Sequence, residues 1–539
     1  MSVLPEPIRP ALMCAGAFAI RLGLVLLSIS PLSGGMANAQ SPQPTYDFEN
    51  TIRRDLPLPG AIPPPPPQAS PQSLQTRLEN LEARWRDLRQ QYDRRPQVTL
   101  QQALQIGLRQ NPILVQSYAE LAAAEWSTVA IRREWLPALF FTQPNNAPWA
   151  VALATQNGNQ STSTSATVYQ NLQQFYTSPR LSMRWTFLDP TRVPRLGAEQ
   201  ANVQSKRLLF DVSTRNLILD IQQAYYNLQE ARELRGLYTH LYDLTHAQVR
   251  RAQRLRAQGV NNQGDVSQLR AQLLEQLVQM IQLFQQELQA ANQLARSMSL
   301  TPGQLNSPAD QLSPVAAWPT PLQPSIDEAL TLREEIRINL AQSQNYSWKS
   351  LALLQRYLPQ VALNTQSQMA INDQLQLSSG AQRGFSTSNS ANLSNSVGLT
   401  FNWLLYDGGI NAVEAASLGQ QASASQAAAA TSRLQVTLQV QNNYASFLTN
   451  RIIIDTARDQ VYAARDAVSN AAATYNGTTM NATTFTQTMQ NYVSAVRSYK
   501  ASVKNFNIAV DSLYRNSSLL PPMAAQALAQ ANVTMKAAP

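Results

Sequence analysis

Side chains that could carry out catalysis are scarce in this sequence. The two histidines, His240 and His246, lie six positions apart in a stretch predicted to be helical. They are therefore well separated around the helix axis and are poor candidates to share a metal ion. The only cysteine is Cys14, and the sequence contains no glycine-rich phosphate loop, nucleophile elbow or zinc-ligand spacing. These observations predict a protein that is not an enzyme and that uses no cofactor or metal.

Polar and large apolar side chains alternate in several short segments. The alternation is clearest at about 360–372 and 395–405, is good at 180–188, and is weak at about 138–154, which Pro144 and Pro148 interrupt. A period of two over about ten residues is typical of a tilted strand with water on one side and lipid on the other. The side chains predicted to line a pore are Ser182, Arg184, Thr186, Ser396, Thr400 and Asn402. Those predicted to face lipid are Leu181, Met183, Trp185, Phe187, Val397, Leu399, Phe401 and Trp403.

A soluble hairpin is the alternative interpretation of each strand pair taken alone. It is disfavoured because Gly398 and small polar residues fall on one side of the alternation and the large residues on the other. Four strands cannot close a membrane barrel, and an open sheet edge in lipid leaves backbone groups unpaired. Several chains are therefore expected to share one barrel.

The elements that would hold these strands occur twice. At an offset of 218 positions (403 − 185), Trp185 aligns with Trp403 and Gly259 with Gly477. Each copy predicts a long helical hairpin, at 190–302 and 408–520, and its first helix would span ~100 Å at about 1.5 Å per residue. The two glycines permit the positive φ that lets a helix reverse. With the short helices that precede the strands, the predicted repeats are 98–302 and 325–522, followed by a tail at 523–539.

The segment before the first repeat has three parts. Residues 1–39 combine a basic region, a short apolar core and a small-residue cleavage site, which predicts a signal peptide rather than an anchoring helix. Residues 40–73 are rich in proline and predict an extended spacer. Residues 74–95 predict a short helix, either amphipathic and packed on the main body or forming a self-associating coil.

The composition excludes some classes of partner. The chain has a net charge of +9, with 14% charged and 44% hydrophobic residues. Its basic residues form no patch with interleaved aromatic side chains, so nucleic acid is not an expected partner. A run of alanines near Ala427 allows close helix packing or simply reflects helix propensity.

The order of these features resembles the outer membrane efflux protein family, typified by the TolC channel. The resemblance spans roughly residues 98–522. It implies a mainly α fold with a small membrane β portion, in which a homotrimer shares an α-helical barrel and a 12-stranded β-barrel. It also implies two partners, a periplasmic adaptor (membrane fusion) protein and an inner-membrane transporter of the RND, ABC or MFS type. The residues that carry the resemblance include Asn111-Pro112, Leu136-Pro137, Ala224-Tyr225-Tyr226, and Asp407-Gly408-Gly409.

The resemblance also assigns a role to the hairpin tips, as the entrance and the surface that docks the adaptor. In relatives, acidic residues that follow the second tip glycine form a ring that binds cations, but here Thr483 and Thr486 occupy those positions. The first tip keeps Asp265, which is alternatively a helix N-cap. We therefore expect weaker cation selectivity than in the family. The predicted tip residues are Gly259, Asp265, Val266, Gly477, Thr483 and Thr486.

The function predicted from these features is an outer membrane exit duct for efflux or type I secretion. It would be a passive channel that opens when the hairpin helices slide past one another at the tips. The expected location is the outer membrane of a Gram-negative-type bacterium, with the helices in the periplasm. The competing prediction is a secreted, trimeric, coiled-coil fibre, which a continuous heptad without alternating strands would favour.

Overall fold

The computed structural model describes residues 71–143, 152–161, 167–260, 262–379, 384–476 and 482–535. The chain divides into two compact units, 1–89 and 90–539. Helix α2 (Pro71–Asp93) crosses this boundary, in the region where the sequence predicts a helix at 74–95. The predicted signal peptide and most of the predicted proline-rich spacer lie outside the described residues. The second unit holds the remaining elements.

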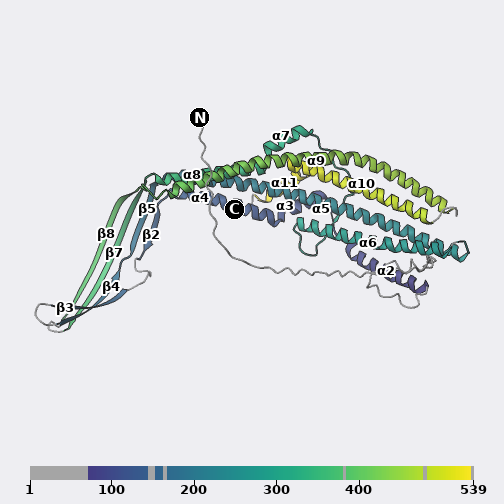
Figure 1. Ribbon diagram of the computed structural model, residues 1–539. Coiled ribbons are helices and arrows are strands. Elements are labelled where there is room, and N and C mark those ends of the chain that lie inside the picture. Colours follow the sequence, from purple (N-terminus) through teal and green to yellow (C-terminus); the bar gives the residue numbers. More distant parts are fainter. Residues whose placement is uncertain are drawn as a thin grey trace, which may run out of the picture. The chain divides into compact units, whose positions relative to one another are not determined.

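Two helical hairpins of matching dimensions dominate this second unit (Figure 1). Hairpin 1 consists of α5 (Arg192–Ala257, 66 residues) and α6 (Gln263–Ser297, 35 residues). Hairpin 2 consists of α9 (Ile410–Asn476, 67 residues) and α10 (Ala482–Asn516, 35 residues). The equivalent helices of the two hairpins thus agree in length to within one residue. A change in the length of one long helix would shift its packing against the other hairpin.

The tip of hairpin 1 reverses as the sequence predicts. Gly259 has a φ of +77°, and the amide of Val260 donates to the carbonyl of Leu255 at 2.9 Å, which closes the end of α5. The side chain of Asn262 then accepts a hydrogen bond from the amide of Asp265 at 2.8 Å and caps α6. The alternative role suggested for Asp265 is thereby corrected, because Asn262 is the N-cap and Asp265 lies in the first helical turn. Gly477 lies outside the described residues.

The strands of the described residues form an antiparallel sheet with four strand paths, of which two are single long strands and two are each divided into two strands. Strands β7 (Gln360–Ser379) and β8 (Gly384–Asn402) are long and pair along their full length. Strands β4 (Thr167–Thr177) and β5 (Arg180–Leu188) pair with successive parts of β7, so together they form one path with a break at Ser178-Pro179. Strands β2 (Ala138–Thr142) and β3 (Ala152–Ser161) pair outside β5 and β4 respectively.

The first repeat therefore differs from expectation in how its strands are divided. The sequence places one weak strand at about 138–154, whereas the described residues of this region belong to two separate strands, β2 and β3. The second repeat carries longer strands than the predicted 360–372 and 395–405. Both strands extend into the Ser- and Asn-rich sequence between the two predicted segments, because small polar residues there continue the strand alternation.

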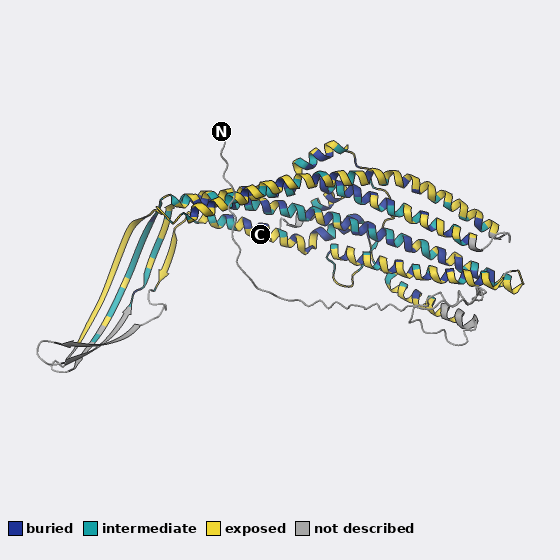
Figure 2. Ribbon diagram, in the orientation of Figure 1, coloured by how far each residue is buried: buried dark blue, intermediate teal, exposed yellow. Residues whose placement is uncertain are grey.

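The main hydrophobic core lies where short helices surround the long ones. These short helices are α3 (Leu100–Gln110), α4 (Pro112–Arg133), α7 (Leu322–Leu332), α8 (Glu334–Leu354) and α11 (Pro522–Met535). A 3₁₀ turn, η1, follows α8 at Gln355–Tyr357. Helix α11 packs on α3 and buries Ala524 and Ala527 completely, so most of the predicted C-terminal tail at 523–539 is a packed helix. Burial is concentrated on α5 and sparse on α9 (Figure 2).

Short parallel strands join the beginning of the first repeat to the linker between repeats. Strand β1 (Gln97–Val98) pairs with β6 (Ser307–Pro308). The hydroxyl of Tyr225 on α5 donates to the carbonyl of Val98 at 3.1 Å, which ties this pair to hairpin 1. Among the described residues, none of the helices combines the length and apolar character needed to cross a membrane.

Candidate channel-forming site

The register of the sheet separates the predicted pore-lining and lipid-facing residues onto opposite faces. Directly opposed residues of paired strands share a face. Ser182 pairs with Gln366, and Gln366 pairs with Ser396, which makes a polar row across three strands. Arg184, Asn364 and Gly398 form the next row, followed by Thr186, Ala362 and Thr400. The last predicted pore residue, Asn402, pairs with Gln360 on the same face.

The opposite face carries the large apolar residues in the same register. Its rows contain Leu139 with Met183, and Trp185 with Leu363 and Leu399. Phe187 sits at a bulge, where the pairing shifts between Thr186 and Leu188, and its ring lies 5.9 Å from that of Trp185. This apolar face is solvent-exposed in the single chain, as Leu181 (54%), Val397 (75%), Leu399 (70%) and Phe401 (61%) show. A two-faced sheet whose apolar side has no protein cover fits a lipid environment.

Two equivalent hydrogen bonds attach the strands to the helices. The indole N–H of Trp185 donates to the carbonyl of Trp135 at 2.9 Å, and that of Trp403 donates to the carbonyl of Tyr357 at 2.9 Å. Each acceptor lies just before the Leu-Pro pair that ends its helix. The repeated Trp thus holds the end of its strand to the end of the preceding helix, and an amphipathic Trp at this level is typical of a membrane interface.

The tip residues that the structure describes differ in their exposure and contacts. Val266 is only 1% exposed, so it packs between α5 and α6 and cannot offer its side chain to a docking partner, which corrects its predicted role. Thr486 hydrogen-bonds to Gln272, joining α10 of hairpin 2 to α6 of hairpin 1. Asp265 is half-buried beside the cap of α6. Thr483 lies in the first turn of α10, and its side chain lies outside the described part of the structure.

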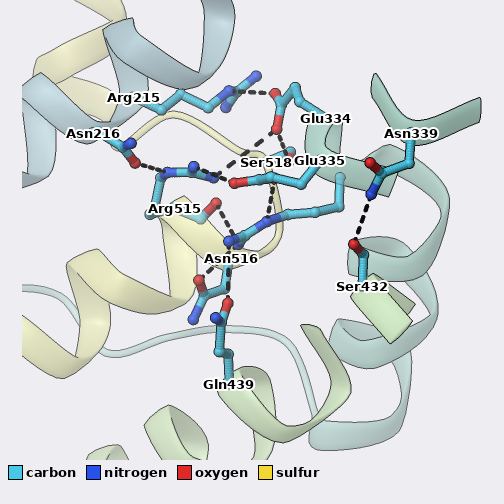
Figure 3. A network of polar contacts seen from close by, with 11 residues as sticks. Arg215, Asn216, Glu334, Glu335, Asn339, Ser432, Gln439, Arg515, Asn516 and Ser518 are labelled. Carbon is cyan, nitrogen blue, oxygen red and sulfur yellow. Dashed lines mark hydrogen bonds and ion pairs between the residues drawn. The ribbon is translucent and has the colours of Figure 1, made fainter. Parts of the chain in front are cut away.

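A buried polar network joins both hairpins at the level of the core (Figure 3). Glu334 at the start of α8 accepts from Arg215 of α5 at 2.7 Å and from the hydroxyl of Ser518 at 2.7 Å. Its neighbour Glu335 accepts from Arg515 of α10 and from Arg333, each at 2.7 Å. Arg333 also donates to Asn516 at 2.7 Å and to Gln439 at 3.1 Å, while Arg515 donates to Asn216 at 2.7 Å. We call these residues the hub.

The charges in the hub stabilise one another because they are withdrawn from water. Burial opposes ionisation of Glu335, but the positive charges of Arg515 and Arg333 hold the pKa of its carboxyl below the ordinary value. Burial, together with the nearby Arg515, lowers the pKa of Arg333. Breaking a buried pair on one side leaves a charge without compensation and costs several kcal/mol. The hub is therefore a strong joint between α5, α8, α9 and α10.

A buried carboxyl group, that of Asp511, lies one turn before Arg515 on α10. Burial raises the pKa of Asp511 from its ordinary value to about 7, against the opposing effect of hydrogen bonds to Tyr226 and Gln222 of α5. The same burial, together with Asp511, raises the pKa of the Tyr226 hydroxyl. Asp511 thus adds a polar contact between the two hairpins that depends on its protonation near neutral pH.

Hairpin 1 carries a second buried charge cluster, which has no counterpart among the described residues of hairpin 2. Arg235 of α5 contacts Glu287 of α6 at 2.5 Å and Asp93 at 3.1 Å, and Arg95 lies 3.8 Å from Glu287. The ring of Tyr92 packs edge-on against Phe284 at 5.6 Å. We call this cluster the clasp, because it ties the segment before the first repeat to both helices of the hairpin. At the repeat offset of 218 positions, Arg235, Glu287 and Phe284 correspond to Ile453, Asn505 and Ser502 in hairpin 2.

Sequence reasoning did not find the hub or the clasp. Neither has a local motif, since their members lie far apart in the chain. One feature of the repeat does point to the hub. Asn111 and Arg333 hold equivalent positions before α4 and α8, and each binds the end of a hairpin. Asn111 donates to the carbonyl of Ser297 at 3.0 Å, and Arg333 donates to the carbonyl of Arg515 at 3.3 Å.

The two histidines stay apart from any cluster of metal ligands. His240 is exposed, and His246 is half-buried with its ring stacked on Tyr242 at 6.2 Å. Within the described ranges, no group of three or more His, Cys, Asp or Glu side chains could hold a metal ion.

Similarity to known proteins exists at the level of structure. No protein-family model matches the chain, and no curated protein matches it in sequence. The CmeC outer membrane channel of Campylobacter jejuni is 13% identical and superposes with a TM-score of 0.63, over 80% of this chain and 89% of its own. The outer-membrane channel OprN is 19% identical, with a TM-score of 0.61 over 78% and 89%. The outer membrane protein VceC of Vibrio cholerae is 13% identical, with a TM-score of 0.59 over 78% and 96%. The chain therefore has the TolC-like fold of these outer membrane channels, which confirms the predicted mainly α fold with a small β portion.

Proposed function

We propose that this protein is the outer membrane exit duct of a tripartite efflux or type I secretion system. Three copies form one channel in the outer membrane of a Gram-negative-type bacterium, with the sheets as a 12-stranded barrel and the helices as a tunnel in the periplasm. The duct is passive and performs no bond chemistry. The proposal is supported by the fold shared with outer membrane channels and by three features of the single chain.

The main support for the proposal is that both edges of the two-faced sheet are unpaired in the single chain. Among the strands that the structure describes, β8 pairs only with β7, and the path of β2 and β3 pairs only on its inner side. A sheet with an apolar face directed at lipid cannot leave such edges open, because each unpaired backbone group in hydrocarbon costs several kcal/mol. Pairing β8 of one copy with the β2 and β3 edge of the next satisfies both edges. Three copies of four paths then close a barrel of the size predicted above.

The helices support the same arrangement through their pseudo-symmetry. Helix α8 packs against both α5 and α9, whereas its counterpart α4 packs mainly against α5. The uncovered side of α4 exposes apolar residues such as Trp126 (69%) and Val115 (61%), and α9 exposes Leu434 (74%) and Ile452 (69%). A neighbouring copy whose α9 covers α4 repeats the contact that α9 makes with α8 inside one chain. Such head-to-tail contacts form a closed ring.

The periplasmic adaptor and the inner-membrane transporter enter as partners at the opposite end. A groove of about 290 Å³ runs between α5, α6 and α10, near the part of the hairpins that approaches the tips. Its lining mixes polar and apolar side chains, among them Tyr238, Gln272, Val493 and Arg497. A helical hairpin of an adaptor could dock in a groove of this composition, as amphipathic helices dock in grooves elsewhere.

The decisive experiment measures oligomeric state and conductance together. The full chain is purified in detergent, its mass is determined by light scattering, and it is inserted into a planar lipid bilayer. We expect a trimer that conducts ions and that stays with the outer membrane fraction after alkaline washing. A monomer in detergent, or a trimer that washes off and does not conduct, would instead support the coiled-coil fibre.

A single substitution tests the inter-copy contact. Trp126→Arg places a charge on the uncovered side of α4, and we expect it to shift the detergent-solubilised protein from trimer to monomer. Trp126→Phe is the matched control and should remain trimeric. If both variants stay trimeric, α4 does not lie at the contact between copies.

A further inference from the structure

The tip of hairpin 1 is strongly basic. The last two turns of α5 contain Arg250, Arg251, Arg254 and Arg256. Arg250, Arg254 and Arg256 are exposed, and Arg251 is half-buried. Arg250 and Arg254 lie four residues apart and therefore share one face of the helix. The acidic residue of this tip is Asp265, which is half-buried, so the exposed charge here is positive.

The tip of hairpin 2 carries no charge at all. From 467 to 496 the sequence contains neither a basic nor an acidic residue. The charge at the tip end of the hairpins is therefore set by hairpin 1 alone. Hairpin 2 places no acidic residue between 467 and 496 that could offset these arginines.

Helix stability does not explain the arginines. Cations near a helix C-terminus interact favourably with the helix dipole, which is the ordinary reason to find them there. Helix α9 has nearly the same length as α5 and occupies the same place in its hairpin, yet its last turn has no basic residue. The architecture thus forms without such charges, and their presence on α5 has another use.

The polar face of the sheet, at the opposite end from the tips, also carries positive charge. The polar face of the sheet holds Arg184, and Arg180 falls on the same face four residues earlier. Arg180 donates to Gln368 of β7 at 3.0 Å, and Arg184 is exposed. The register places no Asp or Glu on the polar face of β5, β7 and β8. The acidic residue of these three strands, Asp373, falls on the apolar face.

We propose that the duct prefers anions and that the basic tip of hairpin 1 is the main determinant of this preference. The inference rests on the proposed function and adds the charge class of the favoured solute. Three tips around one entrance bring their arginines together as a positive collar. A ring of arginine side chains attracts anions and repels cations, as in other anion-selective pores. A narrow, low-dielectric opening strengthens this effect by focusing the field.

The test is the reversal potential of single channels of the full-length protein in a KCl gradient. We expect chloride to permeate more readily than potassium at about 0.1 M salt, where the Debye length is about 10 Å. The preference should weaken toward 1 M salt, where screening reduces that length to about 3 Å. A potassium preference at low salt would overturn the inference while leaving the channel itself established. Absence of any conductance would refute the proposed function instead.

Variants then locate the determinant. The triple variant Arg250→Gln, Arg254→Gln, Arg256→Gln should lower the chloride-to-potassium permeability ratio roughly twofold or more. The matched control is Arg109→Gln, which removes an exposed arginine from the last turn of α3 and should leave the ratio unchanged. Arg184→Gln tests the other end and should have a smaller effect than the triple variant. If Arg184→Gln abolishes the preference and the triple variant does not change it, the tip is not the determinant.

Discussion

The two hairpins have the same backbone dimensions and very different surroundings. In α5, Leu217, Ile221 and Tyr225 are almost fully buried, and the equivalent positions in α9 are Gln435, Gln439 and Asn443. Conversely, α9 exposes apolar side chains such as Leu434 and Ile452. Helix α5 is covered within its own chain, whereas α9 has fewer neighbours there. The difference teaches that a duplicated element keeps its geometry while each copy adapts to its own surroundings, and the exposed apolar side chains of α9 are the ones that the proposed trimer would cover.

The largest effect is expected from breaking the hub that joins the hairpins. Glu334→Gln removes a carboxylate that compensates Arg215 and Arg515, and it should reduce the free energy of unfolding by about 3–5 kcal/mol. Asp455→Asn is the control, because its ion pair with Arg458 lies on the surface of α9, and it should cost less than ~1 kcal/mol. Thermal and chemical unfolding in detergent measure both. Equal losses would mean that the hub is not a special joint.

The buried Asp511 should make the contact between the hairpins depend on pH. Its folded-state pKa of about 7 lies above the ordinary value of 3.8, so the ionised form is the less stable one. Stability from this group is fully present below about pH 4 and is lost as the pH rises toward 7. Asp511→Asn should therefore stabilise the protein at pH 8 by about 2–4 kcal/mol and have little effect near pH 4. A pH-independent effect of the substitution would contradict this account.

The clasp should stabilise hairpin 1 and have no counterpart in hairpin 2. Glu287→Gln weakens its contacts with Arg235 and Arg95, and we expect a local loss of roughly 2 kcal/mol. Amide hydrogen exchange should show faster opening of α6 near this position. Asn505→Gln, at the equivalent place in α10, should leave exchange unchanged. Comparable changes in the two hairpins would remove the distinction between them.

The two Trp contacts test whether the repeats behave alike at the membrane end. Trp185→Phe and Trp403→Phe each remove one indole hydrogen bond to a backbone carbonyl. Each should destabilise the protein by about 1 kcal/mol, as measured by thermal unfolding in detergent. A much larger effect at one position would show that the strands of that repeat depend more on their helix.

The smallest effect concerns two serines with positive φ at the ends of α6 and α10. Ser299 and Ser518 have φ values of 56° and 54°, a conformation that glycine adopts more easily. Ser299→Gly should stabilise the protein by up to about 1 kcal/mol. Ser518→Gly should not, because it also removes the hydrogen bond that the hydroxyl donates to Glu334. Unfolding measurements that show equal stabilisation by both changes would exclude a contribution of that bond.

Local patterns alone determined much of this protein. The period of two in the strands is visible residue by residue, and the register places Ser182, Arg184 and Thr400 on one face and Trp185 and Leu399 on the other, as predicted. The repeat and the helical hairpins follow from spacing and from the glycine at the tip. These features depend on neighbours in the chain, and a sequence displays such neighbours directly.

Only the tertiary structure decided which segments far apart in the chain meet. It pairs β4 and β5 with one continuous β7, brings Glu334 to Arg215 and Arg515, and buries Val266 inside hairpin 1. The physical reason is that these contacts are long-range. Each contact depends on the packing of several elements. The residues next to an arginine, a valine or an acid in the sequence do not reveal which residue of another helix will contact it.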